Sequence, residues 1–167
     1  LFAIVLELTL LREINKPVNW RIWQFIFLVI PLISLFLYTI PDVIAHIKIN
    51  YPTRTFSAYT RLLSEANVLI DYIINILFPR PKYFGLFHSD YVVSKSLFTP
   101  FSTFIYTSII VFLLTVSFKT RKLYPYFSFG ILWFFSGHIL ESTALNLELY
   151  FEHRNYLPLY GIVFSVI

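Results

Sequence analysis

The chain has 167 residues, of which 57% are hydrophobic and only 13% are charged, with a formal net charge of +4 at pH 7. Globular domains carry about 25% charged residues, so this composition and a mean hydropathy of +0.71 exclude an ordinary soluble domain. The absence of cysteine excludes disulfides and thiolate metal sites. In so apolar a chain, the basic excess reports the orientation of membrane segments rather than nucleic-acid binding. We therefore expect an integral membrane protein without a nucleic-acid partner.

Five apolar segments are candidates for crossing a membrane. The hydrocarbon core of a bilayer is about 30 Å thick and needs about 20 apolar residues in a helix. The segments 22–40, 101–118 and 123–140 approach this length, and we predict that they span the membrane. The segments 1–11 and 156–167 cover only part of it, so we interpret them as partial spans of a longer polytopic protein. The first of them lacks the basic start and the small-residue cleavage site of a signal peptide.

Residues 60–78, with the sequence TRLLSEANVLIDYIINILF, follow a different pattern. Apolar residues recur at steps of three and four from Leu62 to Leu77, which predicts an amphipathic helix. Polar residues fall on the opposite face, and Arg61 and Glu65 form an i,i+4 pair. A helix that spans the lipid would rarely carry so full a polar face. We expect this helix to lie along the outer membrane surface or to pack re-entrantly against the bundle.

Positive charge gathers in two short stretches beside apolar segments. The basic residues are Arg12, Lys16 and Arg21 in the first stretch and Lys119, Arg121 and Lys122 in the second. Cytoplasmic loops are enriched in Lys and Arg, so both stretches are predicted to be cytoplasmic, with an even number of crossings between them. The spans 22–40 and 101–118 supply two crossings, which leaves helix 60–78 outside. The predicted fold is one all-α domain, 1–167, a polytopic transmembrane helix bundle with one interfacial or re-entrant helix. The outer segments are then 41–59, 79–100 and 141–156.

A cluster of charge follows the third complete span, between Gly137 and Asn155. If this stretch continues as a helix, one face carries His138, Glu141, Glu148, Glu152 and Asn155. Carboxylates that lie close together raise one another's pKa unless cations, hydrogen-bond donors or a metal compensate them. Arg154, His153 or a divalent metal could do so, and His138 and Glu141 are weak candidates for metal ligands. The alternative is a polar helix end at the interface, with Arg154 reaching toward lipid phosphates.

The segment FEHRNYLP, at 151–158, indicates phosphate chemistry. Arginine can bind a phosphate with two parallel hydrogen bonds, and it does so best in partly desolvated sites. Arg154 is therefore the candidate ligand for a lipid-linked phosphate at the outer interface, with Asn155 and Tyr156 as further hydrogen-bonding groups. A second polar segment, GLFHSDYVVSKS, contains His88 and Asp90, which are either substrate contacts or solvated residues. The sequence shows no nucleophile elbow and no phosphate-binding loop.

The segment ESTALNLELYFEHRNYLP resembles a known group of membrane proteins. Together with the preceding RLLSEANVLIDYIINILFPRP and GLFHSDYVVSKSL, it is similar to bacterial proteins related to the transmembrane and tetratricopeptide-repeat O-mannosyltransferases. The similar region covers about residues 60–161, and the heptad EHRNYLP, Glu152–Pro158, is its specific part. The tetratricopeptide repeats that commonly follow in relatives are absent from this chain.

This resemblance implies a GT-C-type glycosyltransferase, a multi-helix membrane enzyme that uses a polyprenyl-phosphate-linked sugar as donor. Its acceptor would be a protein or glycan outside the cytoplasm, which corresponds to the periplasmic face of a bacterial inner membrane. The resemblance carries over Glu152, Arg154 and Asn155 as motif residues, with Arg154 at the donor phosphate. The acidic catalytic base of such enzymes lies in the first outer loop, and no position of this chain matches it. We therefore expect the chain alone to be inactive.

Other functions fit the same sequence. A polysaccharide polymerase, a ligase or a transporter of lipid-linked sugars would also combine apolar helices with charged outer segments. A non-catalytic membrane subunit or truncated pseudo-enzyme would contact a larger partner through its helices. The expected partners are accordingly membrane lipids, a lipid-linked sugar, an acceptor protein, and either the remainder of the chain or a membrane partner subunit.

Overall fold

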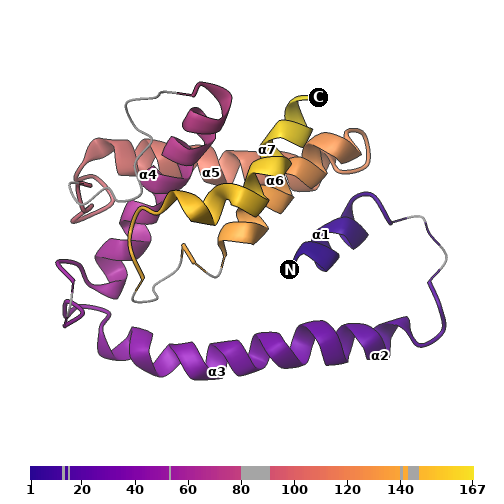
Figure 1. Ribbon diagram of the computed structural model, residues 1–167, viewed down its shortest axis with the longest axis horizontal. Helices are drawn as coiled ribbons and strands as arrows, with labels where there is room; N and C mark the ends of the chain where they lie inside the picture. Colours follow the sequence, from indigo (N-terminus) through magenta and orange to yellow (C-terminus); the bar gives the residue numbers. More distant parts are fainter. Residues whose placement is uncertain (13, 15, 53, 80–90, 140, 143–146) are drawn as a thin grey trace.

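The computed structural model describes residues 1–12, 14, 16–52, 54–79, 91–139, 141–142 and 147–167, and within them the ordered elements are all helical. The α-helices are α1 (Phe2–Leu8), α2 (Trp20–Gln24), α3 (Ile30–Ala45), α4 (Ala58–Leu77), α5 (Phe101–Thr120), α6 (Pro125–His138) and α7 (Tyr156–Val166). A π-helical turn, η1 (Phe25–Val29), joins α2 to α3, and a 3-10 turn, η3 (Glu152–Asn155), precedes α7 (Figure 1). The predicted all-α class is confirmed for these residues.

In the part of the chain that the structure describes, two helices are long and apolar enough to cross a membrane, judged by length and composition. The first is the continuous helix Trp20–Ala45, with 26 residues, and the second is α5, with 20 residues. They contain the predicted spans 22–40 and 101–118. The predicted span 123–140 corresponds to α6, which begins at Pro125 and has only 14 residues. These helices suggest an association with a membrane.

The helix Trp20–Ala45 lies apart from the other helices (Figure 1). None of its side chains is buried, although Trp23, Phe27 and Leu37 are large and apolar. In water such a surface would be unfavourable, since removing one large apolar side chain from water is favourable by about 1.5–3 kcal/mol. The apolar surface of this helix is therefore available for contact with lipid or with another helix.

Helix α4 begins and ends where local chemistry requires. Ser57 is its N-cap, because the Ser57 hydroxyl accepts from the Thr60 amide at 3.3 Å and the Thr60 hydroxyl accepts from the Ser57 amide at 2.9 Å. This reciprocal pair is a capping box that satisfies two amides at the helix start. The helix ends at Leu77, just before Phe78, whose helical conformation is disfavoured by the following Pro79.

Helix α4 crosses the neighbouring ends of α5, α6 and α7. The Asn67 amide donates to the Thr103 hydroxyl at 2.9 Å in the first turn of α5. The Tyr72 ring lies 5.5 Å from that of His138, the last residue of α6. The Tyr72 hydroxyl accepts from the Phe151 amide at 2.8 Å, just before η3 and α7. A helix that lies along the membrane surface would cross the ends of its neighbours, as α4 does here. The interfacial position of α4 itself stays a prediction.

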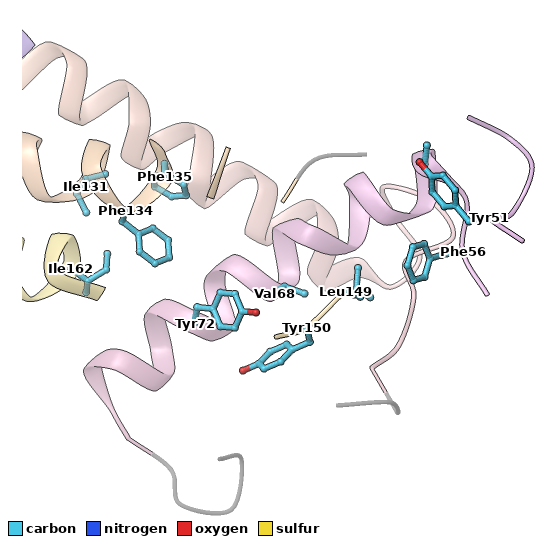
Figure 2. Packing of buried hydrophobic residues seen from close by; sticks show 11 residues of the cluster. Tyr51, Phe56, Val68, Tyr72, Ile131, Phe134, Phe135, Leu149, Tyr150 and Ile162 are labelled. Atoms are coloured by element: carbon cyan, nitrogen blue, oxygen red, sulfur yellow. The ribbon is translucent and has the colours of Figure 1, made fainter. Parts of the chain in front are cut away.

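The hydrophobic core lies where α4 meets α6, α7 and residues 149–150 (Figure 2). It consists of Tyr51, Phe56, Ala58, Val68, Tyr72, Ile131, Phe134, Phe135, Leu149, Tyr150 and Ile162. Figure 2 shows Tyr72 and Tyr150 side by side, between the α6 and α7 side chains and those of Phe56 and Tyr51, and their ring centroids are 4.8 Å apart. The core therefore fixes the position of residues 149–150, which lead into the EHRNYLP heptad.

Candidate functional site

The charged stretch after α6 does not continue as a helix. Helix α6 ends at His138, residues 139, 141–142 and 147–151 are irregular, and only Glu152–Asn155 form a 3-10 turn before α7. The predicted single face carrying His138, Glu141, Glu148 and Glu152 is therefore wrong. A helix would have held three carboxylates close together, whereas the irregular chain separates them.

Each of these carboxylates has different surroundings. Glu141 pairs with Arg154, with an Oε2 to Nε distance of 3.2 Å, and Glu148 pairs with Arg54 at 2.5 Å. Glu152 lines a pocket between α4 and α7. Arg54 lies in the segment before α4, so its pairing with Glu148 could not be read from local spacing. Part of the positive charge that compensates these carboxylates therefore comes from Arg54, which is distant in sequence.

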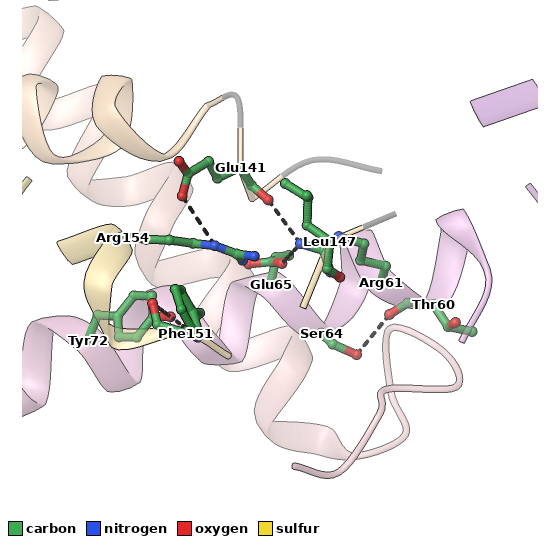
Figure 3. A network of polar contacts seen from close by, with 9 residues as sticks. All are labelled: Thr60, Arg61, Ser64, Glu65, Tyr72, Glu141, Leu147, Phe151 and Arg154. Atoms are coloured by element: carbon green, nitrogen blue, oxygen red, sulfur yellow. Dashed lines mark hydrogen bonds and ion pairs between the residues drawn. The ribbon is translucent and has the colours of Figure 1, made fainter. Parts of the chain in front are cut away.

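Arg61 is a buried residue that holds several parts of the chain together, and we call it the clamp. Sequence analysis predicted only its i,i+4 pairing with Glu65. Its side chain is fully buried and pairs with Glu65 at 2.7 Å. The same guanidinium donates to the carbonyl of Leu147 at 2.5 Å and to that of Glu141 at 2.9 Å (Figure 3). Because peptide carbonyls accept charge-assisted hydrogen bonds well, Arg61 attaches two points of the chain after α6 to α4.

The polar residues of α4 therefore face the protein. Ser64, Glu65 and Asn67 are buried, whereas Leu62 in the apolar stripe is 55% exposed. Sequence analysis predicted apolar and polar stripes on opposite faces of this helix. It did not predict that the polar face would be buried against the rest of the protein. The reason for this burial is the set of partners on other elements, including the amide of Ser94, which donates to the Ser64 hydroxyl at 2.7 Å.

The buried charges influence one another. Burial raises the pKa of Glu65 to about 7, although the positive charges of Arg61 and Arg154 and a contact from Ser142 act to lower it. The Arg154 side chain is only 9% exposed. Figure 3 shows Arg154 directed toward Glu141 and Glu65. Arg154 is thus largely desolvated, and it is already paired with the carboxylate of Glu141.

A pocket of about 500 Å³ opens between α4 and α7. Four predicted site residues, Glu152, His153, Asn155 and Tyr156, line it together. Its remaining wall is formed by residues that sequence analysis did not select, namely Tyr72, Asn75, Ile76, Pro79, Tyr150 and Leu159. Asn75 belongs to the polar face of helix 60–78, and this was the one sequence signal that could have indicated it.

The pocket combines aromatic rings with hydrogen-bonding groups. The Asn75 amide donates to the Tyr150 hydroxyl at 3.1 Å, and the ring centroids of His153 and Tyr156 are 5.5 Å apart. Burial raises the pKa of Tyr150 to about 12, so its hydroxyl stays neutral at pH 7. Such walls suit a ligand that has both apolar faces and hydroxyl groups.

Two predicted site residues lie beside this pocket without lining it. Arg154 projects from η3 toward Glu141, behind the pocket wall. His138 is 1% exposed, and its ring lies against Tyr72 and next to Asn155. Its Nδ1 bonds the Phe134 carbonyl at 3.0 Å.

The remaining candidates are not brought into the pocket. Glu148 is on the surface with Arg54, and His88 and Asp90 lie outside the described residues. Within the described ranges, no group of three His, Asp or Glu side chains is placed to hold a metal ion. The carboxylate of Glu141, one of the two weak metal candidates, is instead bound by Arg154.

Fold and site together define a helical protein that has, in its described residues, two helices suited to a membrane and an aromatic pocket with several polar groups between the end of α4 and the start of α7. Comparisons with protein-family models, with curated proteins and with solved structures found no significant match. A functional conclusion therefore depends on the residues of the pocket and on the resemblance of the heptad EHRNYLP to the O-mannosyltransferases.

Proposed function

We propose that the protein is part of a GT-C-type membrane glycosyltransferase, which transfers a sugar from a polyprenyl-phosphate-linked donor to a protein or glycan on the non-cytoplasmic face. The observation that carries this proposal is the meeting of Glu152, His153, Asn155 and Tyr156 in one pocket. These residues belong to the heptad EHRNYLP, on which the resemblance to O-mannosyltransferases depends. In a bacterium this face would be the periplasmic side of the inner membrane.

The pocket has the properties that a sugar requires. Its volume of about 500 Å³ lies within the range of small-molecule sites, about 300–1,000 Å³. Tyr156, which is 68% exposed, supplies aromatic surface for the C–H faces of a sugar ring, and the buried Tyr72 and Tyr150 form part of the pocket wall. The amide of Asn155 and the carboxylate of Glu152 supply a donor and an acceptor for its hydroxyl groups.

Arg154 is the proposed ligand of the donor phosphate. Departure of a lipid phosphate places negative charge on its oxygens, and a fixed cation stabilises that charge most strongly where water is excluded. The 9% exposure of Arg154 meets this condition, but Glu141 occupies its Nε in this structure. Donor binding would therefore require Arg154 to exchange Glu141 for phosphate. The base that activates the acceptor is expected outside this chain.

Donor binding tests the proposal directly. The intact protein in lipid nanodiscs would be titrated with a polyprenyl-phosphate sugar, and the variants Arg154→Ala and Asn75→Ala would be compared with wild type. Loss of a charge-assisted hydrogen bond should weaken binding by at least about tenfold in Arg154→Ala. Asn75→Ala should weaken binding by about fivefold, since it removes a neutral hydrogen bond.

The matched control is Glu148→Gln, which removes a charge from the same segment but outside the pocket. It should bind the donor like wild type. Equal affinity of wild type, Arg154→Ala and Asn75→Ala would overturn this location of the donor site. Absence of saturable binding by wild type would instead favour a non-catalytic membrane subunit.

A further inference from the structure

A second pocket lies at the opposite ends of α5 and α6 from the candidate site. It has a volume of about 320 Å³ and is bounded by the chain just after α1, by the α5–α6 connection and by the start of α6. Arg12 comes from the first of these, Arg121 and Lys122 from the second. The fold therefore brings together two basic stretches that lie more than 100 residues apart in sequence.

Basic side chains are prominent in the lining of this pocket. Its lining contains three cations and, within the described residues, no acid. Arg121 is half-buried and Lys122 is exposed, and an anion that contacts both of them is attracted to each cation. Two arginines and a lysine are also the side chains that bind phosphate oxygens best.

The surroundings of the pocket match a membrane–water interface. The apolar helix α5 ends at Thr120, and the following Leu123 and Tyr124 are 78% and 64% exposed. Tyr126, which lines the pocket, is 62% exposed. Aromatic side chains at the end of an apolar helix are typical of the headgroup level of a bilayer. Leu10 and Pro125 add apolar walls beside the cations.

We propose that Arg12, Arg121 and Lys122 form a binding site for a phosphate group, which at the end of α5 is most directly supplied by the headgroup of an anionic phospholipid. Basic pockets between membrane helices bind such headgroups on the cytoplasmic side. The site is separate from the candidate sugar pocket and does not depend on a glycosyltransferase activity.

Titration with phosphatidylglycerol tests this site. The intact protein, purified in a zwitterionic detergent, would be titrated with fluorescent phosphatidylglycerol and, separately, with inorganic phosphate. The variants are Arg121→Gln and the triple variant Arg12→Gln, Arg121→Gln, Lys122→Gln. Each cation near a membrane surface contributes about fivefold to the binding of an anionic lipid, so affinity should fall by about fivefold in the single variant and about a hundredfold in the triple variant.

The control is Lys48→Gln, which removes the same charge from an exposed position outside the pocket and should leave binding unchanged. Equal unfolding temperatures of all variants would show that they are folded, since none of the three cations is buried. Lipid binding that is lost in the triple variant and not displaced by inorganic phosphate would identify a headgroup site. Saturable inorganic phosphate binding, lost in the same variant, would identify a site for soluble phosphate. Equal binding by wild type and the triple variant in both titrations would overturn the proposal.

Discussion

Arg61 and Glu65 show how a single helical turn can position a distant segment. Burying a guanidinium is costly, and the charge is tolerated only when its donors are satisfied. Here Glu65 and the carbonyls of Glu141 and Leu147 accept from Arg61. The clamp therefore holds in place the residues that lead into the pocket.

The substitution Glu65→Gln should reduce the pH dependence of stability. Burial raises the pKa of Glu65 from an ordinary value of 4.5 to about 7, ahead of the lowering effect of Arg61. Because the folded protein then holds the proton more tightly than the unfolded chain, this contribution is complete below pH 4.5 and is lost as the pH rises through about 7. The unfolding temperature of wild type in detergent should fall across this window, and that of Glu65→Gln should fall less.

Glu148→Gln is the matched control, because Glu148 is 48% exposed and pairs with Arg54 at the surface. Its unfolding temperature should follow the wild-type pH dependence. If Glu65→Gln retained the full wild-type dependence, the buried carboxyl would not be the group that titrates.

Sequence analysis identified the residue types of the site better than their contacts. The pairing of Arg61 with Glu65 follows from helical spacing and is confirmed at 2.7 Å. The contacts of Arg61 with Glu141 and Leu147 join residues 80 and 86 positions apart, and no local pattern contains such information. The same applies to Arg154, whose orientation toward Glu141 depends on where α6 ends.

At the scale of elements, two glycines bring the backbones of α6 and α7 into close contact. A Cβ atom added at Gly161 would lie 2.5 Å from the Gly130 carbonyl oxygen and 2.9 Å from the Phe134 amide nitrogen. A Cβ added at Gly130 would meet the Gly161 carbonyl oxygen in turn. Small residues let helix backbones approach in this way, especially in membranes. The contact fixes α7, which begins immediately after the heptad's charged residues.

Gly161→Ala should destabilise the protein by about 1–3 kcal/mol, since backbone atoms must move to admit the methyl group. Gly137→Ala is the matched comparison on the same helix pair. Its methyl group would meet side-chain atoms only, namely the Phe2 ring at 3.2 Å, which can rotate, and the Pro158 ring at 2.7 Å, which can change its pucker. We expect a clearly smaller loss for Gly137→Ala when unfolding is followed in detergent. Equal losses would show that the backbone contact is not decisive.

The helix boundaries show what hydrophobic patterning can predict. The spans at 22–40 and 101–118 and the amphipathic helix at 60–78 each coincide with helices, because their patterns are local. The continuation of α6 beyond His138 is wrong, because the competing structure depends on Arg61 binding two carbonyls of that stretch. A non-local partner thus overrides a local helical spacing.

At the scale of the whole molecule, the two pockets lie at opposite ends of α5 and α6. The candidate sugar pocket adjoins the start of α7 and the C-terminal half of α4, whereas the basic pocket adjoins the end of α5. The predicted orientation assigns the basic end to the cytoplasm, by the enrichment of Lys and Arg there. Under that orientation α4 should cross the outer ends of the helices without entering the cytoplasmic half.

Labelling of introduced cysteines would decide the orientation of α4. The chain contains no cysteine, so each introduced thiol is its only target for a membrane-impermeant maleimide. Tyr59 and Leu77, at the two ends of α4, are 48% and 42% exposed and accept a small thiol without loss of core packing. Tyr59→Cys and Leu77→Cys should both react from the outer side, and Lys122→Cys should react only from the cytoplasmic side.

The opposite arrangement has a different labelling pattern. A helix of 20 residues has a length of about 30 Å, which is enough to cross a bilayer. If α4 spanned the membrane, Tyr59→Cys and Leu77→Cys would react from opposite sides. The number of membrane crossings between the two basic stretches would then be odd. Lys122→Cys would then react from the outer side whenever a cysteine at Arg12 reacts from the cytoplasm. Reaction of both α4 thiols on the side opposite to Lys122→Cys would instead place the sugar pocket and the basic pocket on different faces of the membrane, in agreement with the predicted orientation.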